Sequence, residues 1–144
     1  ANYAEALGDP AQVEVVCTVE PENQGVRREG YARHVVFDEA GMEAIGKKRD
    51  TLTAFLEFVI HDISERNKDK VTFEIITPKE ISRRGAQLSI LVHGQGKSLF
   101  DKLAAEGVVA DWREPNVIRI APAPLYNSFE DCYRFGEYLE KAIQ

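Results

Sequence analysis

The segment DEAGMEAIGKKRDTLTAFLEFVIHDISER, residues 38–66, gives the clearest indication of architecture because its apolar residues repeat with the period of a helix. Their spacings of three, four and seven place them on one stripe of a helical surface: Met42, Ile45, Leu52, Leu56, Val59 and Ile63. Asp38 is the expected N-cap, and the polar run at residues 67–70 is the expected stop. The sequence therefore predicts a long amphipathic helix over residues 38–66.

Four short apolar runs follow this helix and are predicted as strands. The first two are residues 71–77 and 87–93. The other two, residues 108–110 and 117–120, are joined by a turn at residues 113–116, which contains proline and asparagine. The four runs thus form two consecutive pairs.

A helix is predicted after each of these pairs. Residues 98–106 form a short one, with Ser98 at a weak capping box and Gly107 where a left-handed C-cap residue is needed. Ser128 begins the last helix with the same kind of cap. The apolar side of that helix is expected to comprise Phe129, Cys132, Tyr133, Phe135, Leu139 and Ile143.

Upstream of residue 38, two further runs suggest a β-hairpin. Residues 12–19 and 26–37 flank a turn-rich cluster at residues 21–25. The complete order becomes ββ-α-ββ-α-ββ-α. Strands in consecutive pairs indicate a mainly antiparallel sheet with helices on one face, which is an α+β fold.

Length and charge bound the class of protein. A chain of 144 residues with 44% apolar content suits one compact domain. Its net charge of −6 argues against binding nucleic acid or a membrane surface, since both need a positive patch. No apolar run reaches the roughly 20 residues that span a bilayer. We therefore expect a soluble, cytoplasmic protein in which Cys17 and Cys132 are small buried apolar residues.

The segment Gly94-Gln95-Gly96-Lys97-Ser98 resembles part of a phosphate-binding loop. That motif needs a glycine five positions before its Gly-Lys-Ser, where this chain has Leu91. A flexible turn before the helix is the better interpretation.

Other residue types give no catalytic or metal site. His34, His61 and His93 lack metal-ligand spacing. Cys132 is expected in the core rather than as a nucleophile. Acidic residues off the apolar stripe, such as Glu43 and Glu57, fit a solvated helix face.

Arg119 is a cation inside an apolar strand, between Ile118 and Ile120. Burying an unpaired guanidinium is very costly, so Arg119 must either face solvent or meet an anion. Both alternatives remain open on physical grounds.

The run GVVADWREPNVIRIAPAPLYNSF, residues 107–129, resembles the C-terminal signature of kynureninases. Upstream segments at residues 38–42, 52–58, 75–78 and 84–89 fit the same family in the same order. The resemblance begins at residue 38. We accordingly divide the chain into an N-terminal hairpin of uncertain origin, residues 1–37, and a kynureninase-like C-terminal domain, residues 38–144.

Kynureninases are pyridoxal-phosphate enzymes of the aspartate-aminotransferase fold. The resemblance implies hydrolysis of kynurenine or 3-hydroxykynurenine to an anthranilate and alanine, in tryptophan catabolism and NAD biosynthesis, by a cytoplasmic homodimer. It also implies that the cofactor is held by a lysine of a large domain outside this sequence. The chain alone is then expected to bind no cofactor and to be inactive.

The same resemblance gives Arg119 a role. The small domain of such enzymes contributes an arginine that binds the substrate α-carboxylate, and the matching position is Arg119. Tyr126 and Asn127 are expected to shape the turn that supports it. The alternative function is a free-standing, non-catalytic binding or assembly domain with the same fold.

Overall fold

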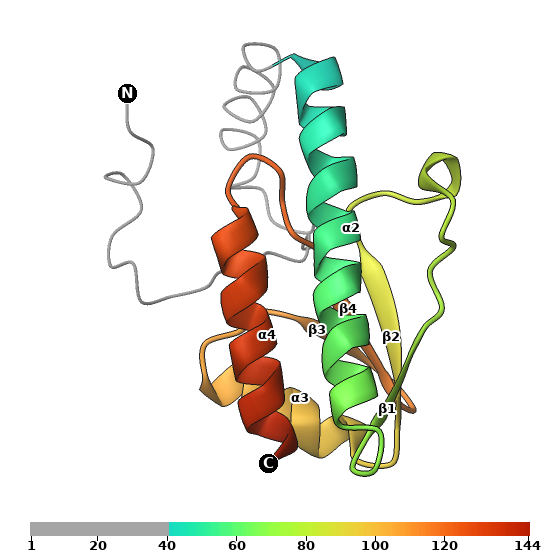
Figure 1. The fold of residues 1–144 in the computed structure, drawn as a ribbon, viewed down its shortest axis with the longest axis vertical. Coiled ribbons are helices and arrows are strands. Elements are labelled where there is room, and N and C mark those ends of the chain that lie inside the picture. The colour runs from blue at the N-terminus through green and yellow to red at the C-terminus, as the bar shows by residue number, and fades with distance from the viewer. Residues whose placement is uncertain (1–40) are drawn as a thin grey trace, which may run out of the picture.

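Three helices lie on one face of a four-stranded sheet in the computed structural model, which describes residues 41–144 (Figure 1). The elements run in the order α2 Met42–Arg66, β1 Thr72–Ile75, β2 Leu88–His93, α3 Gly96–Ala105, β3 Asp111–Arg113, β4 Val117–Ile120 and α4 Phe129–Ile143. A short 3-10 turn, Ile81–Arg83, lies between β1 and β2. The α+β class is confirmed, whereas the hairpin expected within residues 1–37 lies outside the described residues.

The sheet has the strand order β1-β2-β4-β3, and every neighbouring pair is antiparallel. Alternate side chains point to opposite faces of a strand. In β2 and β4 the inward set is fully buried: Leu88, Ile90, Val92, Ile118 and Ile120. The outward set carries the polar residues of the sheet and is therefore the face on which chemistry could occur.

The helices α2 and α4 run side by side in front of the sheet, and α3 crosses near its lower end (Figure 1). Leu52, Leu56 and Ile60 of α2 pack with Phe135 of α4 in one continuous core. Gly136 permits this close crossing, because a Cβ there would lie 2.5 Å from a methyl carbon of Val59. The long amphipathic helix predicted from residue spacing is therefore the central support of the domain.

The helices α2 and α3 begin at other residues than predicted. The helix α2 begins at Met42 with Gly41 as N-cap, so Asp38 is not its cap, and Met42 is 67% exposed instead of buried. The helix α3 begins at Gly96, which places Ser98 inside its first turn instead of at the cap. Gly107 follows α3 with φ +87°, as a left-handed C-cap glycine should.

The strand expected at residues 108–110 is wrong, since β3 is Asp111–Arg113. The backbone N–H of Val108 donates to the carbonyl of Leu103, so this segment closes the end of α3 instead of joining the sheet. The chain enters the sheet only at Asp111, which faces Arg119 across the β3–β4 pair. The predicted strands at residues 71–77, 87–93 and 117–120 are confirmed, with β4 at its predicted bounds and β1 shorter than residues 71–77.

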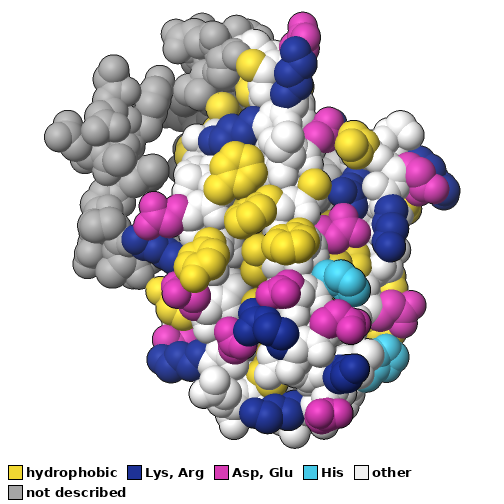
Figure 2. Space-filling view, viewed as in Figure 1, with side chains coloured by type: hydrophobic (Ala, Val, Ile, Leu, Met, Phe, Trp, Pro, Cys, Tyr) yellow, Lys and Arg dark blue, Asp and Glu magenta, His cyan; other side chains and the backbone are white. Residues whose placement is uncertain are grey.

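The start of α4 is confirmed in detail. Ser128 accepts a hydrogen bond from the backbone N–H of Asp131, and the Asp131 carboxylate accepts one from the Ser128 backbone N–H. This reciprocal capping box satisfies two otherwise unpaired donors. The apolar side of α4 is only partly internal, because Phe129 is 47% exposed and Tyr133 59% exposed. Figure 2 shows hydrophobic side chains gathered in the middle of the helix-covered face.

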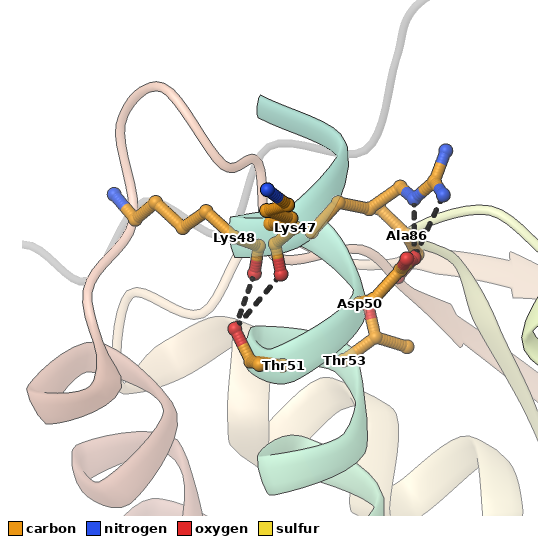
Figure 3. A network of polar contacts seen from close by, with 7 residues as sticks. Lys47, Lys48, Asp50, Thr51, Thr53 and Ala86 are labelled. Carbon is orange, nitrogen blue, oxygen red and sulfur yellow. Dashed lines mark hydrogen bonds and ion pairs between the residues drawn. The ribbon is translucent and has the colours of Figure 1, made fainter. Parts of the chain in front are cut away.

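The long connection between β1 and β2 is fixed to α2 at two points. The buried hydroxyl of Thr53 donates to the carbonyl of Ala86 over 3.4 Å (Figure 3). The Arg84 guanidinium lies 2.6 Å from the Glu57 carboxylate and is only 5% exposed. Glu57 is therefore a half-buried partner in an ion pair, so its expected place on a solvated helix face holds only in part.

Candidate functional site

Arg119 projects from the sheet face opposite the helices. Its neighbours Ile118 and Ile120 are buried on the helix side, so the alternation of the strand sends the arginine outward. The Arg119 side chain keeps 31% of its surface exposed. Both alternatives drawn from the sequence hold in part, because Arg119 is accessible from solvent and also meets an anion.

That anion is the carboxylate of Asp111, the residue directly across the β3–β4 pair. The Nε of Arg119 donates to the Oδ2 atom of Asp111 over 2.6 Å, and Nη2 contacts the same oxygen. Arg113 donates its own Nε to that oxygen over 2.9 Å. A single carboxylate oxygen thus links two guanidinium groups on the outer face of the sheet.

The connection from β4 to α4 contains a turn that is fixed by its own hydrogen bonds. The Oδ1 atom of Asn127, buried to 4% exposure, accepts a hydrogen bond from the backbone N–H of Ala123 over 2.8 Å. The backbone N–H groups of Tyr126 and Asn127 both donate to the Ala123 carbonyl. Asn127 and Tyr126 therefore shape this turn as expected, while their support of Arg119 stays a prediction.

The segment from Gly94 to Ser98 forms a turn and the first residues of α3. Gly94 has φ +98°, a conformation that glycine adopts readily. Gly96 packs against Trp112, because an added Cβ would lie 3.1 Å from its ring. Lys97 pairs with Asp101 one turn later on the same helix. These contacts give the glycines and the lysine structural roles.

Two of the three histidines lie within the described residues. His61 is on the exposed side of α2, and His93 at the end of β2 lies 3.4 Å from Glu74. His34 falls outside the described residues, and within residues 41–144 no three His, Cys, Asp or Glu side chains gather as metal ligands would.

Cys132 is buried in the core, as the sequence predicted, and Cys17 lies outside the described residues. Burial raises the pKa of the Cys132 thiol to about 12, and the nearby Asp131 carboxylate adds to the shift. A thiol with this pKa is a poor nucleophile near neutral pH.

Asp111 and Arg113 were not among the candidates drawn from the sequence. Their partnership with Arg119 depends on the register of the β3–β4 pair, which begins one residue after the segment predicted as a strand. Alternation within Asp111-Trp112-Arg113, with tryptophan inward, was the available signal.

The fold and this cluster define an α+β domain that presents an arginine–carboxylate network on the sheet face opposite its helices. Residues 45–139 match the family model described as the kynureninase C-terminal domain. The chain therefore belongs to the kynureninase C-terminal domain family.

Individual kynureninases are similar over the same part of the chain. The Christiangramia forsetii kynureninase is 56% identical over 108 residues, which cover 75% of this chain and 25% of that protein. The Flavobacterium johnsoniae kynureninase is 54% identical with the same coverage. The Koribacter versatilis kynureninase is 48% identical over 100 residues, covering 69% of this chain and 22% of that protein. The chain thus spans about a quarter of the length of these curated relatives.

Although α2 has 25 residues, no helix within residues 41–144 combines the length and the apolar character needed to cross a bilayer.

Proposed function

We propose that this chain is the C-terminal domain of a longer, pyridoxal-phosphate-dependent kynureninase, which hydrolyses kynurenine or 3-hydroxykynurenine in tryptophan catabolism and NAD biosynthesis. Family membership supports the reaction, and the coverage of only about a quarter of each relative supports the place of the chain within a longer enzyme. A cytoplasmic homodimer belongs to the same proposal. The chain alone is inactive under this proposal.

The role of this domain is to bind the substrate α-carboxylate through Arg119. The observation that carries this assignment is an accessible guanidinium fixed on the outer sheet face by Asp111. A planar guanidinium can hold a carboxylate by two parallel hydrogen bonds. Holding the carboxylate restricts rotation about the substrate Cα and so orients the bond to be broken.

The lysines of this chain do not suit the cofactor. Pyridoxal phosphate, when bound, supplies an electron sink and is held in such enzymes through a lysine amine. A lysine becomes nucleophilic near neutral pH when it is desolvated. All eight lysines of the chain lie within residues 41–144, and all are exposed. The proposal therefore assigns the cofactor lysine to a part of the enzyme outside these 144 residues.

The assignment of Arg119 is tested in the full-length enzyme that contains this sequence. Arg119→Ala is expected to lower kcat/KM for kynurenine at least about 100-fold, because a charged hydrogen-bonding partner of the substrate is removed. Arg83→Ala, which removes a 68% exposed arginine, is the control and should leave kcat/KM unchanged. Wild-type kcat/KM in a folded Arg119→Ala enzyme would remove the carboxylate assignment.

The place of the chain in a longer enzyme is tested separately. The reading frame ahead of Ala1 should continue into a domain that carries the cofactor lysine. The isolated chain, mixed with pyridoxal phosphate and kynurenine, should produce no anthranilate fluorescence. Turnover by the isolated chain would contradict the proposed incompleteness. A frame that does not continue would favour the free-standing binding or assembly domain.

A further inference from the structure

The contact between Asp111 and Arg119 has a geometry suited to orienting the guanidinium. Asp111 approaches from the Nε side and contacts both Nε and Nη2 with one oxygen. The two residues are directly paired on adjacent strands, so the backbone of the sheet sets the distance between them. Asp111 is therefore attached to a rigid strand. Because its side chain is short, fixing it costs little conformational entropy.

Orientation matters because arginine is long and flexible. Immobilising a rotamer-rich side chain on binding costs about 0.5–1.5 kcal/mol. A bidentate grip also requires the plane of the guanidinium to match that of the ligand carboxylate. A partner that fixes this plane before binding removes much of the cost, which is the general benefit of preorganisation.

The charge of the cluster also depends on Arg113. Arg119 and Asp111 alone would form a neutral pair with little attraction for an anion. Arg113, whose side chain is 57% exposed, lies 2.9 Å from the same Oδ2 atom and brings a second positive charge. Arg113 therefore adds a positive charge beside the Asp111–Arg119 pair, which favours a carboxylate ligand.

We propose that Asp111 is a positioning residue for Arg119 and that Arg113 adds positive charge beside them. The three side chains together form the binding site for the substrate α-carboxylate. This inference rests on the proposed function of Arg119. It adds that Asp111 acts through Arg119 without contacting the substrate.

The first test measures the order of the arginine side chain in this chain itself. In ¹⁵N-labelled protein, the heteronuclear NOE of the Arg119 Nε–Hε group should be high, as for the rigid backbone. Asp111→Ala should lower it strongly. Glu114→Ala is the matched control: Glu114 is a carboxylate of the same hairpin that accepts from Trp112, and its removal should leave Arg119 rigid. An Arg119 that stays equally rigid in Asp111→Ala would overturn the positioning role.

The second test uses kinetics of the full-length enzyme. Asp111→Ala should raise KM for kynurenine about threefold, with a smaller change in kcat, because the ordering cost of one side chain is only partly offset by the loss of a negative charge beside the substrate carboxylate. Asp111→Asn keeps an oxygen acceptor beside Nε and should keep KM close to that of wild type. Arg113→Gln should raise KM about threefold because the attraction for the carboxylate weakens. An Asp111→Asn enzyme in which Arg119 is rigid but KM rises as in Asp111→Ala would contradict positioning by this hydrogen bond.

The two proposals fail in distinguishable ways. If Arg119→Ala leaves kcat/KM unchanged, the carboxylate assignment itself is wrong. If Arg119→Ala abolishes activity while Asp111→Ala and Arg113→Gln keep wild-type KM, Arg119 binds the substrate and the inference about its neighbours is wrong.

Discussion

Replacing Arg84 with methionine is expected to destabilise the domain, although Arg84 lies far in sequence from Arg119. The Arg84 side chain is 5% exposed, and its Nη1 atom lies 2.6 Å from Glu57, whose side chain is 21% exposed. The pair connects the segment between β1 and β2 to α2. Breaking a buried pair by removing one partner costs about 3–5 kcal/mol, because the remaining charge loses its partner in a poorly hydrated place.

Removing Arg84 and removing Glu57 should lower the free energy of unfolding by different amounts. Arg84→Met leaves Glu57, which retains enough exposure to be partly hydrated, so we expect a loss of about 2 kcal/mol. Glu57→Gln leaves the more deeply buried Arg84 and should cost about 3–4 kcal/mol. The double variant Arg84→Met, Glu57→Met removes both charges and should cost only about 1 kcal/mol.

The measurement is urea denaturation of the chain, monitored by circular dichroism, with the free energy of unfolding extrapolated to water. Arg83→Met is the matched control, since Arg83 is 68% exposed and 3.8 Å from Glu80, and it should change stability by no more than about 0.5 kcal/mol. Additive costs in the double variant, or a loss in Arg84→Met no larger than in the control, would refute the reasoning.

Two further stability predictions follow from the C-terminal helix. Ser128→Ala removes the acceptor of the capping box and should lower the free energy of unfolding by about 1 kcal/mol in the same urea assay; an unchanged midpoint would contradict the capping role. Cys132→Ala should reduce the loss of unfolding free energy that occurs as the pH rises above about 9. Because the folded thiol has a pKa of about 12 while the unfolded thiol ionises from its ordinary value of 9.0, wild-type stability should fall between these pH values by up to about 4 kcal/mol. Parallel profiles for wild type and variant would contradict this assignment.

The elements with a strong periodic pattern were predictable from the sequence. The helix α2 was expected from its apolar spacing, β4 at its observed bounds, and the Ser128 cap from a local motif. Each of these features depends on residues close together in the chain. Local sequence was therefore sufficient for them.

The predictions that the structure corrected concern residues whose environment depends on contacts with residues distant in the sequence. Residues 108–110 are apolar and β-prone, yet Val108 closes α3 and the strand begins only at Asp111. Glu57 lies off the predicted apolar stripe, but an ion pair with Arg84, 27 residues away, leaves it half-buried. Tertiary packing overrides local propensity in both cases.

In the candidate site too, one residue could be identified from the local sequence and another only from the fold. Arg119 was identified as an unusual cation in an apolar strand, and its substrate role came from the family resemblance. Asp111 could be identified only after the β3–β4 register was known, because the register places it opposite Arg119.

Binding of the substrate carboxylate by Arg119 can be measured with one pair of inhibition constants. The deaminated analogue of kynurenine retains the carboxylate, and its carboxamide is a neutral ligand of nearly the same shape. The full-length wild-type enzyme should bind the carboxylate form about 10–100-fold more tightly, as expected for a charge-assisted bidentate contact. Arg119→Met should bind both ligands equally. An Arg119→Met enzyme that still prefers the carboxylate by the wild-type factor would contradict the claim.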